Sequence, residues 1–139
     1  MASLVYDKMM DALVKAGIDF STANKYKVML VTAAYTPDKA AHQFRNQVTN
    51  ETTGTGYTSG GVVSAVTLNN DVSNHRQDVT FGTVSWTNAT ITARAAVIYQ
   101  DNGSAATDRL IAYVDFSQDV SSTNAAFAVT FSSPLRFQN

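Results

Sequence analysis

The sequence predicts a mainly β protein, an antiparallel β-sandwich or barrel-like domain preceded by a short N-terminal helix. From residue 62 onward, short runs rich in β-branched and aromatic residues alternate with clusters of Asn, Asp, Gly and Ser. In two of these runs, 109–116 and 125–131, apolar residues recur at every second position, which is the period of a half-buried strand. A chain of 139 residues, 45% of them hydrophobic, is also long enough to form one self-standing core.

The first expected element is a helix. Residues 3–16 favour one apolar helical face, with Ser3 as the expected N-cap and Gly17 just past the end. Such a short helix is marginal in water, so its apolar face needs a partner surface in the domain or on a neighbour. We therefore expect a helical arm over residues 1–18 and a single antiparallel β domain over 19–139. The candidate partner-binding residues on the arm are Leu4, Val5, Met9 and Leu13.

The β domain is expected to begin with a buried strand over 25–35, which a turn at Pro37 ends. The next stretch, 37–48, could hold a helical turn with Thr36 or Asp38 near its cap. Further strands are expected at 62–68, 76–86, 89–100, 109–116 and 125–131, with turns that include 87–88, 101–108 and 117–124. The large residues expected in the core of this domain are Trp86, Phe127, Val129 and Phe131.

The stretch ETTGTGYTSGG, residues 51–61, raises the question of a phosphate-binding loop. Such a loop needs a helix N-terminus after it, and the P-loop also ends in Lys and Ser or Thr. Here the loop runs into the β-branched sequence VVSAVTL, and no lysine follows Lys39. We therefore expect a structural loop in which Tyr57 fixes the chain by its ring. The exposed tip of the loop is expected to contact a neighbour, and Tyr57 is also a candidate partner-binding residue. Positive φ angles or close backbone approaches are expected at Gly54, Gly56, Gly60 and Gly61.

The residue inventory predicts no enzymatic activity and no cofactor. Cysteine is absent, and His42 and His75 have no histidine partner at metal-ligand spacing, so no metal site is expected. No turn of the kind that presents a nucleophilic serine is visible. A glycosidase pair of Asp115 with Asp119 or Asp78 is conceivable, but solvated loop carboxylates are the favoured interpretation. The Asn102-Gly103 sequence within 101–108 predicts a turn rather than a calcium loop.

The charge and hydropathy of the chain indicate which classes of partner it can bind. The net charge of −1 and the charged fraction of 15% provide no field that would gather nucleic acid or an anionic membrane. No apolar run approaches membrane-spanning length, and the N-terminus lacks the pattern of a secretory signal. All lysines lie within the first 39 residues, which indicates either a solvated helix face or a docking arm for an acidic partner.

A sugar-stacking platform is a second possible use of the aromatic residues. Such a platform on a sandwich face would give an adhesin-like carbohydrate-binding module, whereas the competing interpretation places the same rings in the core. The candidates are Tyr57, Trp86, Tyr99, Tyr113 and Phe116.

Several ordered segments resemble a family of small structural proteins of tailed bacteriophages. The resemblance covers roughly residues 1–131 and is carried by YKVMLVTAAYTPD, His42, VTNETTGTGYTSGG, VSWTNATITARAAVIYQD and RLIAYVDF. Its strongest elements are Glu51 with G-x-G-Y-x-x-G-G, the tryptophan before NATITARAAVIY, and LIAYVDF. None of these is a catalytic signature.

The resemblance implies a capsid decoration or cement protein that binds the outer shell in many copies. The implied partners are the major capsid protein or other virion proteins, and by analogy further copies of the chain in a homo-oligomer. The implied location is the virion, after synthesis and assembly in the cytoplasm of the bacterial host. A tail or neck component, or an adhesin-like module, is the alternative within the same particle.

Overall fold

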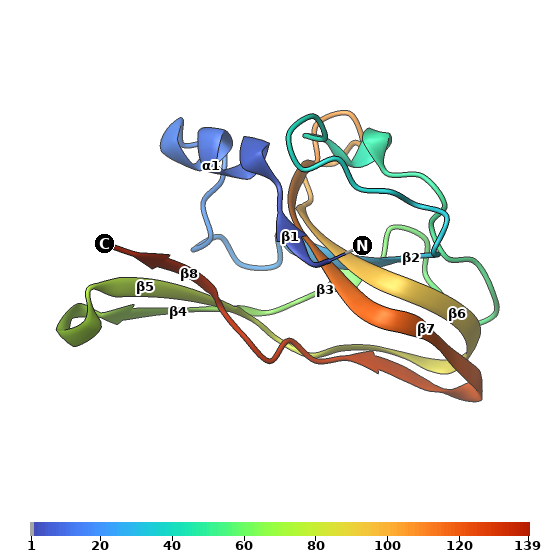
Figure 1. Cartoon of the computed structure of the whole chain (residues 1–139). Coiled ribbons are helices and arrows are strands. Elements are labelled where there is room, and N and C mark those ends of the chain that lie inside the picture. Colours follow the sequence, from blue (N-terminus) through green and yellow to red (C-terminus); the bar gives the residue numbers. More distant parts are fainter. Residues whose placement is uncertain (1) are drawn as a thin grey trace.

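Two long strands, β6 (Val84–Gln100) and β7 (Arg109–Val129), run antiparallel and dominate the computed structural model, which describes residues 2–139. They belong to a five-stranded sheet with the order β1-β7-β6-β2-β3 (Figure 1). The other members of this sheet are β1 (Leu4–Val5), β2 (Tyr26–Val31) and β3 (Val62–Val63).

A second, three-stranded antiparallel sheet has the order β4-β5-β8 and extends to the left of the first in Figure 1. Its strands are β4 (Val66–Asp71), β5 (Arg76–Phe81) and β8 (Leu135–Gln138). The short 3₁₀ helix η2 (Val72–Asn74) connects β4 to β5. The mainly β, sandwich-like fold class expected from the sequence is thereby confirmed.

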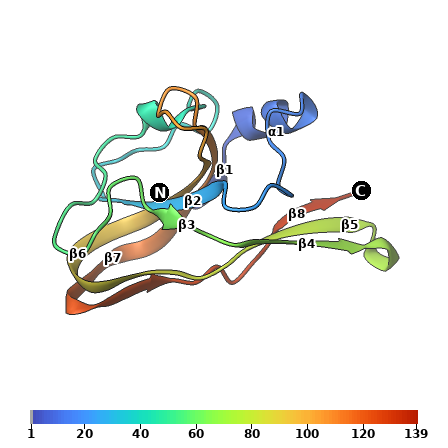
Figure 2. The ribbon, with the colours of Figure 1, turned by 180° about the vertical axis from the view of Figure 1, so that it is seen from behind.

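The two sheets share one long ribbon. β5 leads into β6 and β7 leads into β8, so the pairing of β6 with β7 is followed by that of β5 with β8. The hydroxyls of Thr83 and Thr130 lie 3.1 Å apart where the ribbon passes from one sheet to the other. Figures 1 and 2 show the ribbon bending sharply within β6 and β7, so that it contributes to both layers.

Two turns expected from the sequence do not end strands. Residues 87–88 lie within β6 and residues 117–124 lie within β7. Three residues there, Asn88, Ser117 and Asn124, have positive φ angles, and the register of the pair shifts between Trp86 and Ala89. Asparagine tolerates the left-handed region, so these polar clusters form β-bulges that bend a continuous strand.

The helix is shorter than the sequence predicted. Helix α1 spans Asp7–Val14, and the Leu4–Val5 pair before it forms β1 against β7. Ser3 is therefore not the N-cap, which is Tyr6. Strand pairing takes precedence over the helical pattern because it satisfies backbone groups that the first helical turn would leave unpaired.

The end of α1 is a Schellman motif. The N–H of Ala16 donates to the carbonyl of Leu13 at 3.2 Å, and the N–H of Gly17 donates to that of Ala12 at 2.7 Å. The left-handed residue is Ala16, with φ 60°, rather than the expected Gly17. The N–H of Gly17 caps the helix from one position further along.

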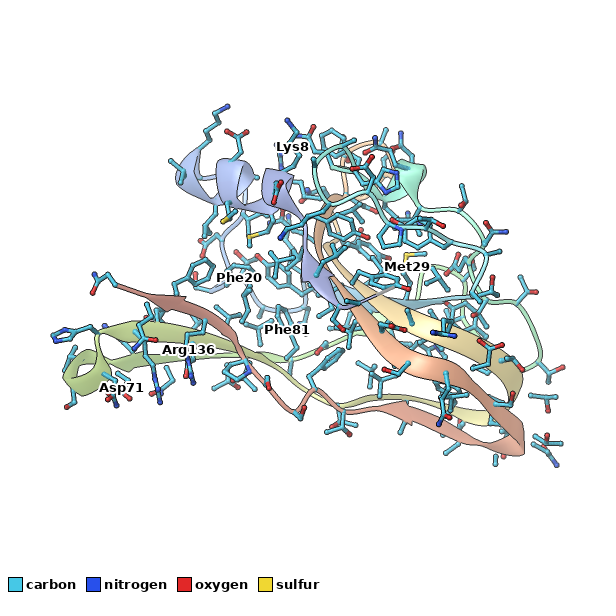
Figure 3. The ribbon with its side chains drawn as sticks, in the orientation of Figure 1. Lys8, Phe20, Met29, Asp71, Phe81 and Arg136 are labelled. Atoms are coloured by element: carbon cyan, nitrogen blue, oxygen red, sulfur yellow. The ribbon has the colours of Figure 1, made fainter. Side chains whose placement is uncertain are left out.

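The core lies between the two sheets and under α1. Trp86, Phe127 and Val129 are buried there as expected, and Phe131 is half-buried against the same cluster. Next to them, the rings of Phe20, Tyr26 and Phe81 contact one another at centroid distances of 5.2 to 6.5 Å. Figure 3 places Phe20 and Phe81 in the space between the loop after α1 and the three-stranded sheet.

The stretch 37–48 contains the expected turn with Asp38 at its cap, where the N–H of His42 donates to the carbonyl of Asp38 at 3.0 Å. The carboxylate of Asp38 accepts from the N–H groups of Ala40 and Ala41, and the 3₁₀ helix η1 follows at Arg45–Gln47. Within residues 2–139, the structure contains no helix with the length and apolar character needed to cross a bilayer.

Candidate functional site

The glycine loop, residues 51–61, is organised by the carboxylate of Glu51. The hydroxyl of Tyr57 donates to Glu51 Oε2 at 2.6 Å, and the N–H of Gly60 donates to the same oxygen at 2.7 Å. The other oxygen, Oε1, accepts from the hydroxyl of Ser59 at 3.3 Å. The N–H of Leu30 on β2 donates to the Tyr57 oxygen at 3.0 Å. One carboxylate therefore ties the loop to itself, and Tyr57 ties it to the five-stranded sheet.

The backbone of this loop requires its glycines, as the sequence predicted. At Gly61 φ is +80°, and a Cβ atom there would lie 1.9 Å from the carbonyl oxygen of Val28. At Gly54 φ is +148°, and a Cβ would lie 2.5 Å from the carbonyl oxygen of Thr90. Gly56 and Gly60 also have positive φ angles. β3 follows the loop, so no helix N-terminus is placed to receive a phosphate.

The ring of Tyr57 holds the loop against the core. The ring is half-buried and its centroid lies 5.5 Å from that of Trp86. The hydroxyl donates to the carboxylate of Glu51 and accepts from the N–H of Leu30. Burial, together with the bond to Glu51, raises the pKa of the Tyr57 hydroxyl. The expected anchoring role is confirmed, and the polar atom of Tyr57 is directed into the protein rather than toward a partner.

The four candidate partner-binding residues of the arm pack against the protein's own core. Met9 is buried, and Leu4, Val5 and Leu13 are half-buried against the same clusters. Met9 is therefore out of reach of a neighbour, which corrects the expectation for this residue. The physical reason is that β1 pairs with β7 and turns the apolar face of α1 inward. The apolar residues that α1 leaves exposed are Met10 and Val14, one turn apart.

The proposed sugar-stacking platform is not present as a surface. Trp86, Tyr99 and Tyr113 are at most 3% exposed, so a sugar ring cannot reach their faces. The Tyr99 hydroxyl donates to the carbonyl of Gly60, and burial raises its pKa to about 12. Phe116 is half-buried against Phe127. The core interpretation of these rings is the one that the structure supports.

The carboxylates considered as a glycosidase pair have other partners. Both oxygens of Asp78 accept from Arg136, at 2.7 and 3.0 Å, and this bidentate bond holds the pKa of Asp78 below its usual value. Asp115 accepts from Nε of Arg94 at 3.1 Å. Asp78 lies on the three-stranded sheet and Asp115 on the five-stranded one, whereas Asp119 is exposed on β7. No general acid and base are arranged around a common cleft by these residues.

Neither histidine belongs to a metal site within residues 2–139. Nδ1 of His42 accepts from the N–H of Asp38 at 3.1 Å and lies 2.9 Å from the hydroxyl of Tyr35. His75 adopts the left-handed conformation at the end of η2. In this part of the chain no three His, Asp or Glu side chains converge to hold a metal ion.

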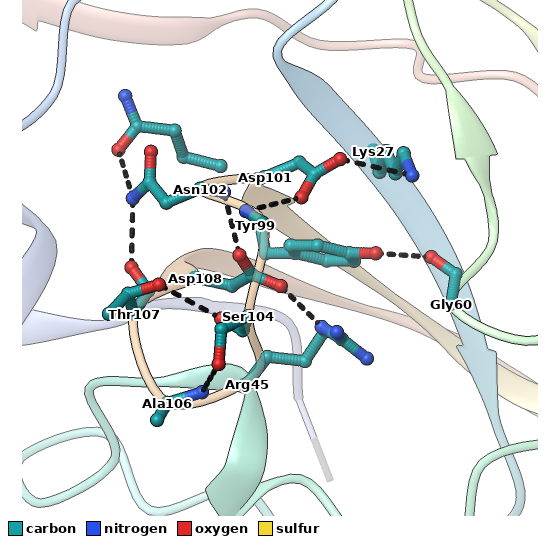
Figure 4. A network of polar contacts seen from close by, with 12 residues as sticks. Lys27, Arg45, Gly60, Tyr99, Asp101, Asn102, Ser104, Ala106, Thr107 and Asp108 are labelled. Carbon is teal, nitrogen blue, oxygen red and sulfur yellow. Dashed lines mark hydrogen bonds and ion pairs between the residues drawn. The ribbon is translucent and has the colours of Figure 1, made fainter.

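The 101–108 segment is a turn built around a buried ion pair (Figure 4). Asp108 is fully buried, and its Oδ2 accepts from Nε of Arg45 at 2.7 Å. Its Oδ1 accepts from the N–H of Asn102 at 2.6 Å, which closes the turn. Nearby, Lys27 pairs with Asp101 at 3.1 Å. The expected turn is confirmed, and its carboxylates accept hydrogen bonds and form ion pairs within the chain.

An apolar groove lies between the sheets and was not foreseen from the sequence. Its volume is about 630 Å³, and its walls are β1 with part of β7 on one side and residues 130–135 on the other. The residues of these walls are far apart in the sequence, so no local sequence pattern could identify the groove. The residues that line it include Leu4, Val5, Phe81, Val114, Phe131 and Leu135.

A second depression, of about 520 Å³, has a different lining. Of the residues that the structure describes, seven hydroxyl side chains and no aromatic or charged residue line this depression. The hydroxyls of Thr92 and Ser121 lie 2.7 Å apart and form a hydrogen bond with each other. The lining residues are Thr32, Thr53, Thr90, Ile91, Thr92, Ser121, Ser122 and Thr123.

Comparison with known proteins gives no further constraint on the role of these features. A scan against protein-family models and searches of curated proteins and solved structures found no match. The candidate features of the molecule are therefore two surface hollows of opposite character and a rigid glycine loop. Concave hollows of this size are where small ligands commonly bind in proteins.

Proposed function

We propose that this protein is a structural protein of a tailed-bacteriophage particle and binds the outer shell of the capsid in many copies as a decoration protein. The observation that carries the proposal is where the segments of the resemblance lie in the fold. Glu51 and its glycines build a rigid loop, Trp86 lies in the core, and the LIAYVDF segment is part of β7. The residues that carry the resemblance thus occupy structural positions, which supports a structural role.

Two further features support a binding role over a catalytic one. The carboxylates Glu51, Asp78 and Asp108 are each engaged by donors from the same chain. Among residues 2–139, Lys39 is the one charged residue that lines the two surface hollows. A protein that acts through contact surfaces needs such a rigid scaffold and does not need a reactive side chain.

Co-sedimentation with capsids that have been stripped of this protein tests the proposal. Purified protein is added over a concentration series, and the amount that pellets with the shells is measured against a β-sandwich domain of similar size as the control. Saturable binding at a fixed, repeated ratio to the major capsid protein is the expected result. Absence of the protein from the pellet, or its restriction to the tail in cryo-electron microscopy of whole particles, would contradict it.

A second candidate is an adhesin-like carbohydrate-binding module in a tail or neck position. The hydroxyl-lined depression supports it, because several converging hydroxyls can hydrogen-bond to a neutral sugar. Glycan-array binding by the isolated protein, abolished in the Thr53→Val/Thr123→Val variant, would favour this role. The matched control is Thr67→Val, which changes an exposed threonine on β4.

A further inference from the structure

The apolar groove has an unpaired strand edge as one wall. β1 pairs with β7 on one side and ends the five-stranded sheet on the other. The N–H of Tyr6 donates to the carbonyl of Ile111 on β7. Because backbone groups of successive residues point to opposite sides of a strand, the N–H and C=O of Val5 point away from β7. No hydrogen bond joins them to any of residues 2–139.

The opposite wall also lacks strand pairing. Residues 130–134 connect β7 to β8 without belonging to either, and Pro134 has no N–H to donate. Figure 1 shows this segment below β1, where the chain passes from the large sheet to the small one. The groove is therefore bounded by the free edge of a strand on one side and by an unpaired segment on the other.

Lys39 marks one end of this free edge. The N–H of Asp7, which is the next outward-facing group after Val5, donates to the carbonyl of Lys39 at 2.9 Å. A strand added beside β1 would consequently end where the Lys39 backbone already occupies the edge. Lys39 is also the only charged residue that lines the groove, and its ammonium has no ion pair among residues 2–139.

We infer that the groove binds an extended peptide segment of another protein of the particle, which adds as a strand to β1. Its side chains at alternate positions are apolar and enter the groove, and a carboxylate at one end pairs with Lys39. Strand addition of this kind takes its affinity from backbone hydrogen bonds and its specificity from pockets for alternate side chains. The inference deepens the proposed function and rests on it for the source of the peptide.

The features of the groove favour a peptide over other occupants. An apolar acid would use the apolar lining and Lys39 but would leave the Val5 backbone groups unpaired, at a desolvation cost. A second copy would have to present an extended segment with apolar side chains and a free carboxylate. The chain's terminal strand β8 is already paired with β5 and carries Arg136 in place of an acid.

A displayed library of random nine-residue peptides is the first probe. Selection on the full chain is expected to enrich peptides with apolar residues at alternate positions and Asp or Glu at one end. Their affinity should fall at least tenfold for Lys39→Glu and stay within twofold for Lys8→Glu, which reverses an exposed lysine on α1. No enrichment of such peptides, or equal binding by Lys39→Glu, would overturn the inference.

A variant that fills the groove tests the inference without changing any charge. Ser132 is exposed and lines the groove, so Ser132→Trp should block it without removing a core contact. Peptide binding is expected to be lost in this variant and retained in Ser73→Trp, which places the same ring on η2. Equal thermal transitions of the two variants would show that both fold. Retained binding in Ser132→Trp would contradict the assignment.

Capsid co-sedimentation separates this inference from the proposed function. If the wild type pellets with stripped shells but Ser132→Trp and Lys39→Glu pellet equally well, the decoration role stands and the groove is not the contact. If the selected peptides bind but the wild type does not pellet, the groove stands and the decoration role fails. Competition between a selected peptide and the shells would support both.

Discussion

Glu51 and Tyr57 are hydrogen-bonded to each other within the glycine loop, with the tyrosine hydroxyl donating to the carboxylate at 2.6 Å. The same carboxylate oxygen accepts from the backbone of Gly60, and the Tyr57 oxygen accepts from the backbone of Leu30. The pair thus connects the two ends of the loop and joins both to β2. Removing either member leaves buried donors without an acceptor, which costs more than the bond itself contributes.

Substitution of the carboxylate should therefore weaken the whole fold. Glu51→Ala is expected to lower the free energy of unfolding by about 2 kcal/mol, because the donors of Tyr57 and Gly60 lose their acceptor. Urea denaturation followed by the fluorescence of Trp86 measures this. The control is Asp119→Ala, an exposed carboxylate on β7, which should change stability by less than about 0.5 kcal/mol. Equal effects of the two substitutions would contradict the role of Glu51.

Gly61 should not accept any side chain. Gly61→Ala is expected to destabilise the protein by about 3 kcal/mol or more, because the added Cβ would overlap the carbonyl of Val28. The matched control is Gly103→Ala, which has a similar positive φ angle but no atom within 4 Å of the new Cβ. That variant should lose only about 1 kcal/mol, the cost of the left-handed conformation. Similar losses in both variants would show that backbone strain, rather than the contact with Val28, is decisive.

The end of α1 offers a stabilising change. Ala16 is exposed and adopts φ 60° in the Schellman motif, where glycine is the common residue. Ala16→Gly should raise the free energy of unfolding by about 0.5–1 kcal/mol, because relief of the left-handed strain exceeds the added flexibility of the unfolded chain. Thermal unfolding by circular dichroism measures the change. A lower transition temperature would contradict the strain argument.

All six tyrosines have raised pKa values, chiefly because burial disfavours the charged phenolate. For Tyr26 and Tyr99 the raised pKa is about 12. The unfolded chain ionises near pH 10, so it releases protons first, and stability should fall as the pH rises from about 10 through 12.

Absorbance at 295 nm measures this behaviour. The native protein should show almost no phenolate at pH 10.5, and its tyrosines should ionise together with the loss of circular dichroism at higher pH. The same chain in concentrated guanidinium chloride should titrate near pH 10. Partial ionisation of the native protein at pH 10, without unfolding, would show that some of these hydroxyls are accessible.

The parts of the structure that the sequence predicted depend on local chemistry. Glycine and asparagine restrict the backbone directly, so the loop at 51–61 and the turn at 101–108 could be located from composition. The burial of Phe127 followed from the alternation of apolar residues along a β-rich run, and that of Trp86 from the need of a sandwich core for a large residue. These inferences need no knowledge of which strands lie next to each other.

The parts that were missed depend on pairing between distant residues. Leu4 and Val5 fit a helical face as well as a strand, and only the presence of β7 beside them decides for the strand. Residues 87–88 and 117–124 have turn composition, but their partner strand continues past them and converts them into bulges. The groove and the role of Lys39 likewise arise from segments that meet only in the folded chain.

The long ribbon, in which β5 and β6 pair with β8 and β7, also sets an order in which the chain can fold. Its two arms are joined by the short 101–108 turn, where Gln100 and Arg109 pair at little entropic cost. Pairing can then extend residue by residue along β6 and β7, through the bulges at Asn88 and Asn124, and on to β5 and β8. It is complete when Arg76 pairs with Gln138. The pairing of β5 with β8 therefore joins residues of large sequence separation and should form late. The amides in this pairing should be the first to exchange with solvent deuterium when the native protein opens locally.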